Sequence, residues 1–346
     1  MNNSNTRPDG RLRWVDDCKG ICIVLVVYGH VVGGLVAAGT VLEGTAFERG
    51  RNWVYLFHMP AFFFLSGLFA SRALGRPLKA VLSTRLKTLA YPYVLWTGIY
   101  LLVQMVMARY ANNAPDTARA LRFLWEPYGY GLWFLYSLFL ISILFHLLLL
   151  ARLPKAAVLL LAVGLYVAAA FNVFGFWPIL NTAMLNFIFY ALGGLYSAAA
   201  FTWFSNGRRT YPFAAGIIFL VIMTMVAWAF GYSKFPISLL AALLGVAGIV
   251  CIAKGLPDRI VEKFFCLLGF YSLEIYLGHP LFSTAARAVL NKLHVQAPWV
   301  YVVAGVLCGV FISLTLAVTC RRLNFPFLYR WPVSNRGSDI LKPTSA

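Results

Sequence analysis

Charged residues are scarce in this chain, and acidic residues are the scarcest of them. Of 346 residues, 12% are charged and only 11 are Asp or Glu, whereas 61% are hydrophobic and the mean hydropathy is +0.77. Such values exclude an ordinary water-soluble globular protein, in which about a quarter of the residues are charged. The 29 Lys and Arg residues give a net charge of +18. Because they are spread along the chain and form no single patch, we expect no nucleic-acid partner.

Signatures of familiar catalytic and metal sites are also missing. Six cysteines occur without a CxxC pair or a metal-like cluster, so we expect structural thiols and no bound metal. The patterns GxSxG, HExxH, Walker A and GxGxxG are absent, which argues against the common serine hydrolase, zincin and nucleotide-binding routes. The polar residues that interrupt the apolar runs are therefore the candidates for chemistry.

Long apolar runs fill most of the chain. Each has about the 20 residues that a helix needs to cross a bilayer, and each is continuously apolar, whereas the strands of a membrane barrel alternate in polarity. The sequence therefore predicts an all-α, polytopic integral membrane protein with about ten transmembrane helices. The expected spans lie near Gly20–Leu42, Val54–Ala70, Leu89–Ala108, Gly131–Ala151, Ala156–Phe174, Met184–Phe204, Tyr211–Ala229, Phe235–Ala253, Leu267–Ala286 and Trp299–Val318.

The basic residues indicate how these spans are oriented, because short cytoplasmic loops are enriched in Lys and Arg. With the N-terminus inside, 21 of the 29 basic residues fall on the cytoplasmic side. We therefore expect a multi-pass protein of the cell inner (plasma) membrane with both termini cytoplasmic, whose basic loops contact anionic membrane lipids. A cleavable signal peptide is disfavoured, because the first apolar run is longer than a signal h-region and contains a histidine.

We expect a single membrane-embedded domain over residues 1–346, because no soluble domain or long linker interrupts the spans. Its core covers 12–331, and 1–11 and 332–346 are expected to be flexible tails. The longest outer loop, Arg109–Tyr130, is too short to form a domain of its own. No pattern in the sequence indicates an oligomeric state.

Two ionisable residues stand out in the first span. Lys19 and His30 are eleven residues apart, almost three helical turns, so they share one face and lie about 16 Å apart along the axis. Asp16 lies on the same side of the helix as Lys19 and is placed to orient or neutralise it. Gly29 and Gly33 flank the histidine, which leaves room beside the imidazole or permits close helix packing. Ionisable groups inside a bilayer usually mark a pathway or a reaction site, although a structural histidine fits the pattern too.

The second span begins with FHMPAFFFLSG, which places His58 near the outer surface. A proline is tolerated in the first turn of a helix, so Pro60 does not disrupt the span. His58 is either a substrate contact or an interfacial polar anchor beside aromatic residues.

A polar stripe runs along the ninth span, GFYSLEIYLGHPLF. Ser272, Tyr276 and His279 are spaced by four and three residues and therefore line one face. Pro280 frees the carbonyl group of Tyr276, an irregularity that is better tolerated beside a cavity than against lipid. Glu274 points to another side, where a structural ion pair competes with substrate binding as its role.

Two basic clusters are expected on the cytoplasmic side. Arg85 and Lys87 precede the run TLAYPYVLW, and Arg208 and Arg209 lie in a very short loop. The general enrichment of Lys and Arg in cytoplasmic loops explains both clusters, and binding of a phosphate-bearing ligand is the functional alternative.

Read together, these segments resemble the acyltransferase family 3 membrane proteins. That family begins with an Arg or Lys, ten residues and a His, with an Asp three residues before the basic residue, as in RLRWVDDCKGICIVLVVYGH. FHMPAFFFLSG, LAYPYVLW, GLWFLYSLF and SLEIYLGHP follow in the family's order. The resemblance covers nearly the whole chain and is strongest to the fucose 4-O-acetylase-like branch.

The resemblance implies a ten-helix inner-membrane enzyme that moves an acyl group, usually acetyl from cytoplasmic acetyl-CoA, to a hydroxyl of a sugar or lipid-linked glycan. Lys19 and His30 match the family's essential pair, and Asp16 matches its accompanying acid. The family's paired-arginine motif is altered here to Arg85-Leu86-Lys87, with a different spacing. Many members carry an extra soluble domain, which we do not expect here.

The residue types suit this chemistry. A sugar hydroxyl is a poor nucleophile, and an imidazole that takes its proton contributes about 10² to 10⁴ in rate, so His30 is the predicted general base near the middle of its helix. His58 and His279 would assist from the outer half. Lys19, Arg85, Lys87, Arg208 and Arg209 are the predicted contacts of the anionic acyl-CoA.

Other functions stay open at this point. A transporter or flippase for a glycan or a small polar solute also has many helices, buried His and Glu, and kinked spans. The ordered motifs and the lack of an evident inverted repeat count against it. A larger donor such as succinyl-CoA fits the same residues, and neither the acceptor nor the choice between an acyl-enzyme and direct transfer is encoded in a readable motif.

Overall fold

The structure is a computed structural model that describes residues 12–110, 131–205, 210–231, 235–256 and 259–332. The long elements in these ranges are all helices, which confirms the predicted all-α class. The expected tails at 1–11 and 332–346 lie outside this part of the chain, except for residue 332. The helices are α1 Arg13–Ala37, α2 Ala46–Tyr55, α3 His58–Gly67, α4 Leu78–Arg85, α5 Tyr91–Tyr110, α7 Trp133–Leu150, α8 Lys155–Ala170, α9 Pro178–Leu195, α10 Ser197–Ser205, α11 Thr210–Phe230, α12 Ile237–Lys254, α13 Arg259–Phe270, α14 Ser272–Lys292, α15 Pro298–Leu307 and α16 Ser313–Arg322.

Eight helical segments of the described residues are long and apolar enough to cross a bilayer. The two remaining predicted spans fall on α8, which has 16 residues, and on α14, which has 21 residues but is interrupted by polar side chains. The protein is thus a polytopic membrane protein, while the total of ten spans and the cytoplasmic termini stay predictions.

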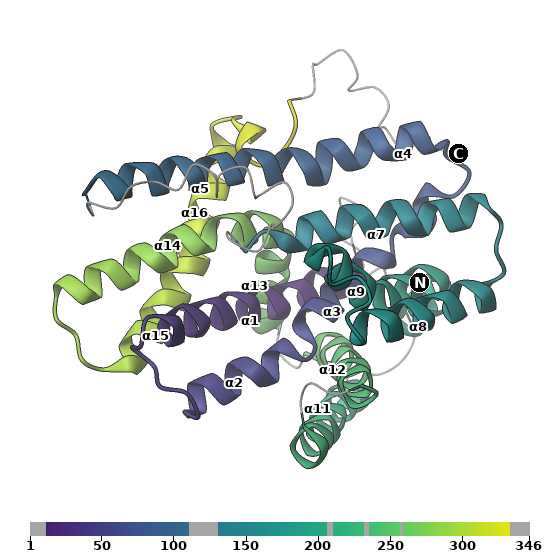
Figure 1. Ribbon diagram of the computed structural model, residues 1–346, viewed down its shortest axis with the longest axis horizontal. Helices are drawn as coiled ribbons and strands as arrows, with labels where there is room; N and C mark the ends of the chain where they lie inside the picture. The colour runs from purple at the N-terminus through teal and green to yellow at the C-terminus, as the bar shows by residue number, and fades with distance from the viewer. Residues whose placement is uncertain (1–11, 111–130, 206–209, 232–234, 257–258, 333–346) are drawn as a thin grey trace.

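Helix α1 lies in the middle of the bundle and packs against α2, α3, α12, α13, α14 and α15 (Figure 1). Its contact with α13 is a direct backbone contact. A methyl group added at Gly20 would lie 1.9 Å from the carbonyl oxygen of Phe265, and one at Gly269 would lie 1.7 Å from that of Asp16. Only glycine fits at these two positions, so the helix that carries His30 is fixed by close contact at its N-terminal half.

The pairs α3–α9 and α11–α12 make two further close contacts around this centre. In the first pair, Gly67 and Gly193 face backbone carbonyl oxygens, at 2.1 Å from an added methyl group in both cases. In Figure 1 the α11–α12 pair lies at the lower edge of the bundle and α5 at the upper edge. Buried aromatic and aliphatic side chains, among them Phe63, Phe145 and Phe187, fill the space between the helices.

Two of the long spans contain π-helical turns. Leu86–Ala90 joins α4 to α5, and Cys308–Ile312 joins α15 to α16. A π-turn inserts one extra residue into the helical ladder and is common near functional sites. The first of these turns begins directly after Arg85, so that residue belongs to a helix and not to the loop that the sequence suggested.

The structure corrects two helix boundaries and one residue position that were expected from the sequence. The segment expected as one span from residue 267 to 286 is two helices, because the chain breaks at Tyr271 between α13 and α14. The span expected from residue 184 begins earlier, at Pro178, where a proline at the first helical position favours initiation. His30 does not lie at the middle of its helix but seven residues before the end of α1, about 10 Å from it.

The six cysteines are free thiols, and five of them are buried. This agrees with the structural role that their spacing predicts.

Candidate active site

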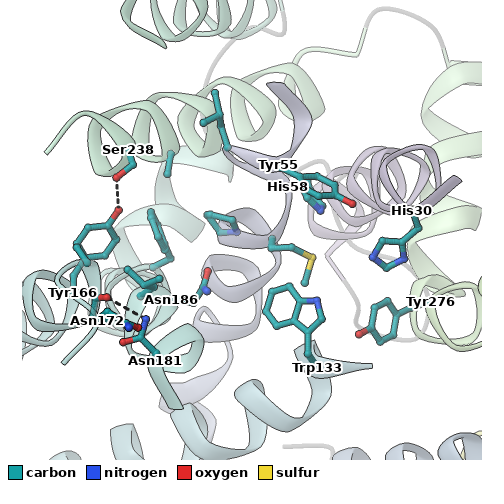
Figure 2. Close-up of a pocket in the computed structure, with 18 residues that line it drawn as sticks. His30, Tyr55, His58, Trp133, Tyr166, Asn172, Asn181, Asn186, Ser238 and Tyr276 are labelled. Atoms are coloured by element: carbon teal, nitrogen blue, oxygen red, sulfur yellow. Dashed lines mark hydrogen bonds between the residues drawn. The ribbon is translucent and has the colours of Figure 1, made fainter. Parts of the chain in front are cut away.

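A cavity of about 560 Å³ lies between helices α1, α2, α3, α7, α8, α9, α12 and α14. Its volume is typical of small-molecule sites, which span roughly 300–1,000 Å³. His30, His58 and Tyr276 are among the residues that line it, and Figure 2 shows them together with Tyr55 and Trp133 around its right-hand part. Three of the predicted site residues, which come from three different helices, therefore share one cavity.

His30 is paired directly with His279 behind it. Nδ1 of His30 lies 2.7 Å from Nε2 of His279, and the two rings stack with centroids 4.9 Å apart. The pair joins α1 to α14, which pack along each other. His279 is fully buried, whereas His30 is partly exposed to the cavity. The sequence predicts neither this hydrogen-bonded pair nor which of the two histidines faces the cavity.

Pro280 determines how the protons of this pair are arranged. Because proline has no N–H, the carbonyl oxygen of Tyr276 four residues earlier has no helical donor. Nδ1 of His279 donates to this oxygen at 2.8 Å, and the carbonyl oxygen of Ile275 lies 3.1 Å from the same nitrogen. This confirms the expectation that Pro280 frees the Tyr276 carbonyl.

The tautomers follow from these contacts. A carbonyl oxygen only accepts, so Nδ1 of neutral His279 carries the proton and its Nε2 is an acceptor. Nδ1 of His30 must then donate to that acceptor, which leaves Nε2 of His30 unprotonated. Among the described residues, Nε2 of His30 has no hydrogen-bond partner, so its lone pair is open to a ligand in the cavity. This is the state that a general base requires.

Tyr276 fixes the wall of the cavity next to this pair. Its hydroxyl donates to the carbonyl oxygen of Gly131 at 2.6 Å and accepts from the backbone N–H of Phe134 at 3.3 Å. The ring also lies against His279, with centroids 6.1 Å apart. Tyr276 therefore ties α14 to the start of α7 and holds the histidine pair in place.

A hydrogen bond to the backbone just before α3 orients His58. Its Nδ1 donates to the carbonyl oxygen of Val54 at 2.7 Å, which leaves Nε2 as an acceptor beside the cavity. The ring of Tyr55 lies 5.1 Å from it. Gly29 provides the space for that ring, because a methyl group there would lie 2.4 Å from Tyr55 Cε1. The Gly29–Gly33 pair thus accommodates a side chain of α2 beside His30.

Three predicted substrate contacts do not line this cavity. His279 lies behind His30, and Ser272 lies at the start of α14, one turn before Tyr276. Glu274 is buried and forms an ion pair with Arg321 at 3.5 Å. The guanidinium group of Arg321 in turn stacks on Phe270 at 4.3 Å. The geometry matches the structural alternative for Glu274 and gives no support at this cavity for substrate binding by these three residues.

The predicted donor-side residues lie toward the other end of the bundle. Lys19 is half-buried, with its Nζ 5.6 Å from the centre of the Phe69 ring, and Asp16 is buried beside α13. Arg85 is partly buried, and its Nε has no hydrogen-bond partner among the described residues. Lys87 is exposed and lies within the π-helical turn that follows Arg85. Arg208 and Arg209 lie outside the described residues.

The far part of the cavity was not anticipated from the sequence. Asn181 lies at the start of α9, before the residue at which the expected span began, whereas Asn186 lies inside the expected span but was not singled out. Polar groups inside apolar helices are costly and therefore informative, so the pattern NTAMLN was a usable signal. The polar and aromatic cavity residues that the sequence analysis missed are Tyr55, Trp133, Tyr166, Asn172, Asn181, Asn186, Phe189 and Ser238.

The profile of the acyltransferase domain that defines acyltransferase family 3 matches residues 12–318. The chain belongs to this family. This acyltransferase family 3 protein is 25% identical over 304 residues to the inner membrane protein YcfT of Escherichia coli strain K12, over 80% of this chain and 82% of YcfT. No solved structure matches it. The resemblance expected from the motifs is confirmed, and the chain is a multi-pass membrane acyltransferase.

Proposed function

We propose that this protein transfers an acyl group, acetyl in the simplest case, from cytoplasmic acyl-CoA to a hydroxyl of a cell-surface or lipid-linked glycan. The observation that carries the proposal is the unprotonated Nε2 of His30, held open to a cavity large enough for a sugar by its hydrogen bond to His279. Membership of an acyltransferase family supplies the class of reaction.

His30 would act as the general base. As the acceptor oxygen attacks the thioester carbon, its proton moves to Nε2 of His30, and a C–O bond forms. The C–S bond then breaks, and the leaving CoA sulfur takes the proton back from the imidazolium, so that the products are an ester and free CoA. His279 accepts a hydrogen bond from His30 throughout, which keeps the ring oriented and stabilises the positive charge that forms on it.

The donor would arrive from the Lys19 end of α1. Lys19 and His30 are separated by about 16 Å along the helix axis, a separation that an extended pantetheine arm can bridge while its phosphates stay near basic groups. Arg85 offers a partly buried guanidinium group for such a phosphate. Asp16, buried where α1 touches α13, would hold the entrance of α1 in position.

The proposed membrane location is consistent with a donor that arrives from one side and an acceptor that binds near the other. The related YcfT is an inner membrane protein, and we propose the same membrane for this chain, with both termini cytoplasmic. The cavity then lies in the outer half of the bundle, since it is lined by residues at the ends of α2 and α8 and the starts of α3, α9 and α12. Acyl transfer would proceed from the cytoplasmic toward the outer side.

Mass spectrometry of surface glycans tests the proposal in cells. Cells that express the protein should carry an acyl mass on a glycan hydroxyl, and cells without it or with His30→Ala should not. Identical glycan spectra in all three strains would contradict the proposed reaction.

A further inference from the structure

The cavity has a second part that the proposed reaction does not use. In Figure 2, His30 and Tyr276 lie at one side, and Tyr166 and Asn181 lie at the opposite side with Ser238 above them. Asn186 lies between the two parts. This distal part is built by helices α8, α9 and α12, none of which carries a residue of the acyl-transfer step.

The two amides of α9 present acceptors to the cavity. Nδ2 of Asn181 donates to the carbonyl oxygen of Ala169 at 3.1 Å, and Nδ2 of Asn186 donates to that of Thr182 at 2.8 Å. The amide groups are thereby fixed in orientation, and their Oδ1 atoms are left for other partners. Oδ1 of Asn181 is buried and has no hydrogen-bond partner among the described residues. A buried acceptor without a partner is unfavourable, and a ligand that donates a hydrogen bond would satisfy it.

Hydroxyl groups and aromatic rings complete this part of the cavity. The hydroxyls of Tyr166 and Ser238 are 3.1 Å apart, and both can donate or accept. The rings of Tyr166 and Phe189 contribute flat apolar surfaces to the lining. Such a combination of a few fixed polar groups with aromatic walls is typical of sites that orient a small polar molecule.

The described lining has no formal charge. None of the residues that the structure describes around the cavity is Asp, Glu, Lys or Arg. A carboxylate or phosphate group moved into this space would lose its hydration without gaining a counter-charge, which is strongly unfavourable. The chemistry of the distal part therefore selects an uncharged ligand that is rich in hydroxyl donors.

We infer that the distal part of the cavity is the acceptor subsite and that it binds an uncharged glycosyl residue, whose hydroxyls donate to Oδ1 of Asn181 and Asn186. The inference rests on the proposed function, because a sugar is the expected ligand only if a glycan is the acyl acceptor. Because this subsite and His30 belong to the same cavity, a glycan held by these amides can present one of its hydroxyls to Nε2 of His30. Acidic sugars and phosphorylated head groups are excluded from this subsite.

Binding of simple glycosides without acyl-CoA tests the inference. Saturation-transfer NMR on the full chain in lipid nanodiscs would compare methyl α-D-glucopyranoside and methyl α-L-fucopyranoside with methyl β-D-glucuronide. We expect binding of at least one neutral glycoside, with the glucuronide at least tenfold weaker. Asn181→Leu and Asn186→Leu, which keep the side-chain volume, should each weaken binding of the neutral glycoside about five- to tenfold.

A matched control separates this result from other causes. Asn52→Leu removes a similar amide, which bonds to Glu48 on α2 outside the cavity and should leave binding unchanged. Asn181→Ala provides a second variant if the leucine variant does not yield a monodisperse protein.

The outcomes are distinguishable. Binding of the glucuronide as tight as that of the neutral glycosides, no binding of either neutral glycoside, or unchanged binding in both asparagine variants would overturn the subsite. If the glycosides bind as expected but no acyl group is ever transferred, the proposed function fails and the subsite stands.

Discussion

Removal of His279 should slow acyl transfer without removing the base itself. In His279→Ala, Nδ1 of His30 loses its acceptor at 2.7 Å. The ring of His30 is then free to rotate or to carry its proton on Nε2, which blocks the lone pair that the substrate needs. His279→Gln keeps an amide oxygen that can accept from His30 and an amide N–H that can reach the freed carbonyl of Tyr276, so it should retain most of the activity.

The size of the effect follows from the hydrogen bonds involved. Removing the acceptor leaves a buried donor without a partner, which costs about 1–3 kcal/mol. At 1.36 kcal/mol per factor of ten, His279→Ala should lower kcat roughly 10- to 100-fold. Loss of the general base in His30→Ala should cost about 10² to 10⁴. Because His279 acts only through His30, the double variant should be no slower than His30→Ala alone.

The assay measures release of free CoA from acetyl-CoA by purified variants mixed with membranes that supply the native acceptor. Size-exclusion profiles and thermal midpoints check that each variant is folded, since the alanine variant creates a cavity in the bundle. Additive losses in the double variant, or full activity in His279→Ala, would show that His279 does not position His30.

The other variants test packing and donor binding. Gly269→Ala places a methyl group 1.7 Å from the Asp16 carbonyl oxygen and should lower the thermal midpoint, with an overpacking cost of about 1–3 kcal/mol, whereas Gly98→Ala, where nothing lies within 4 Å, should not. Equal midpoints for the two variants would refute the close α1–α13 contact. Arg85→Ala should raise the KM for acetyl-CoA about tenfold through loss of a charge-assisted hydrogen bond, and exposed Lys87→Ala should raise it less. Unchanged KM in the Arg85 variant would remove it from the donor site.

The sequence predicts the class of fold well because bilayer thickness fixes the length of each apolar run. All ten expected spans fall on helices, and the polar face of the ninth span carries Tyr276 and His279 as expected. Breaks inside apolar runs are harder to foresee, because the run stays apolar on both sides of the break at Tyr271, between α13 and α14.

The site is only partly encoded in local patterns. His30 and His58 are recognisable because ionisable groups are rare in spans. The His30–His279 hydrogen bond joins residues 249 positions apart, so no spacing rule reveals it. The amide of Asn181 is oriented by the carbonyl oxygen of Ala169 in α8, a contact that likewise becomes visible only once the helices are assembled.

Acyl transfer by the purified protein in sealed vesicles tests the proposed reaction most directly. Vesicles would receive labelled acetyl-CoA on the cytoplasmic face of the protein and glycan acceptor on the other, and the glycan would be analysed by mass spectrometry. We predict an acetyl ester on a glycan hydroxyl with the wild type and none with folded His30→Ala. No acetylated glycan with the wild type, together with glycan movement across the vesicle membrane that survives His30→Ala, would contradict the enzyme and indicate a transporter.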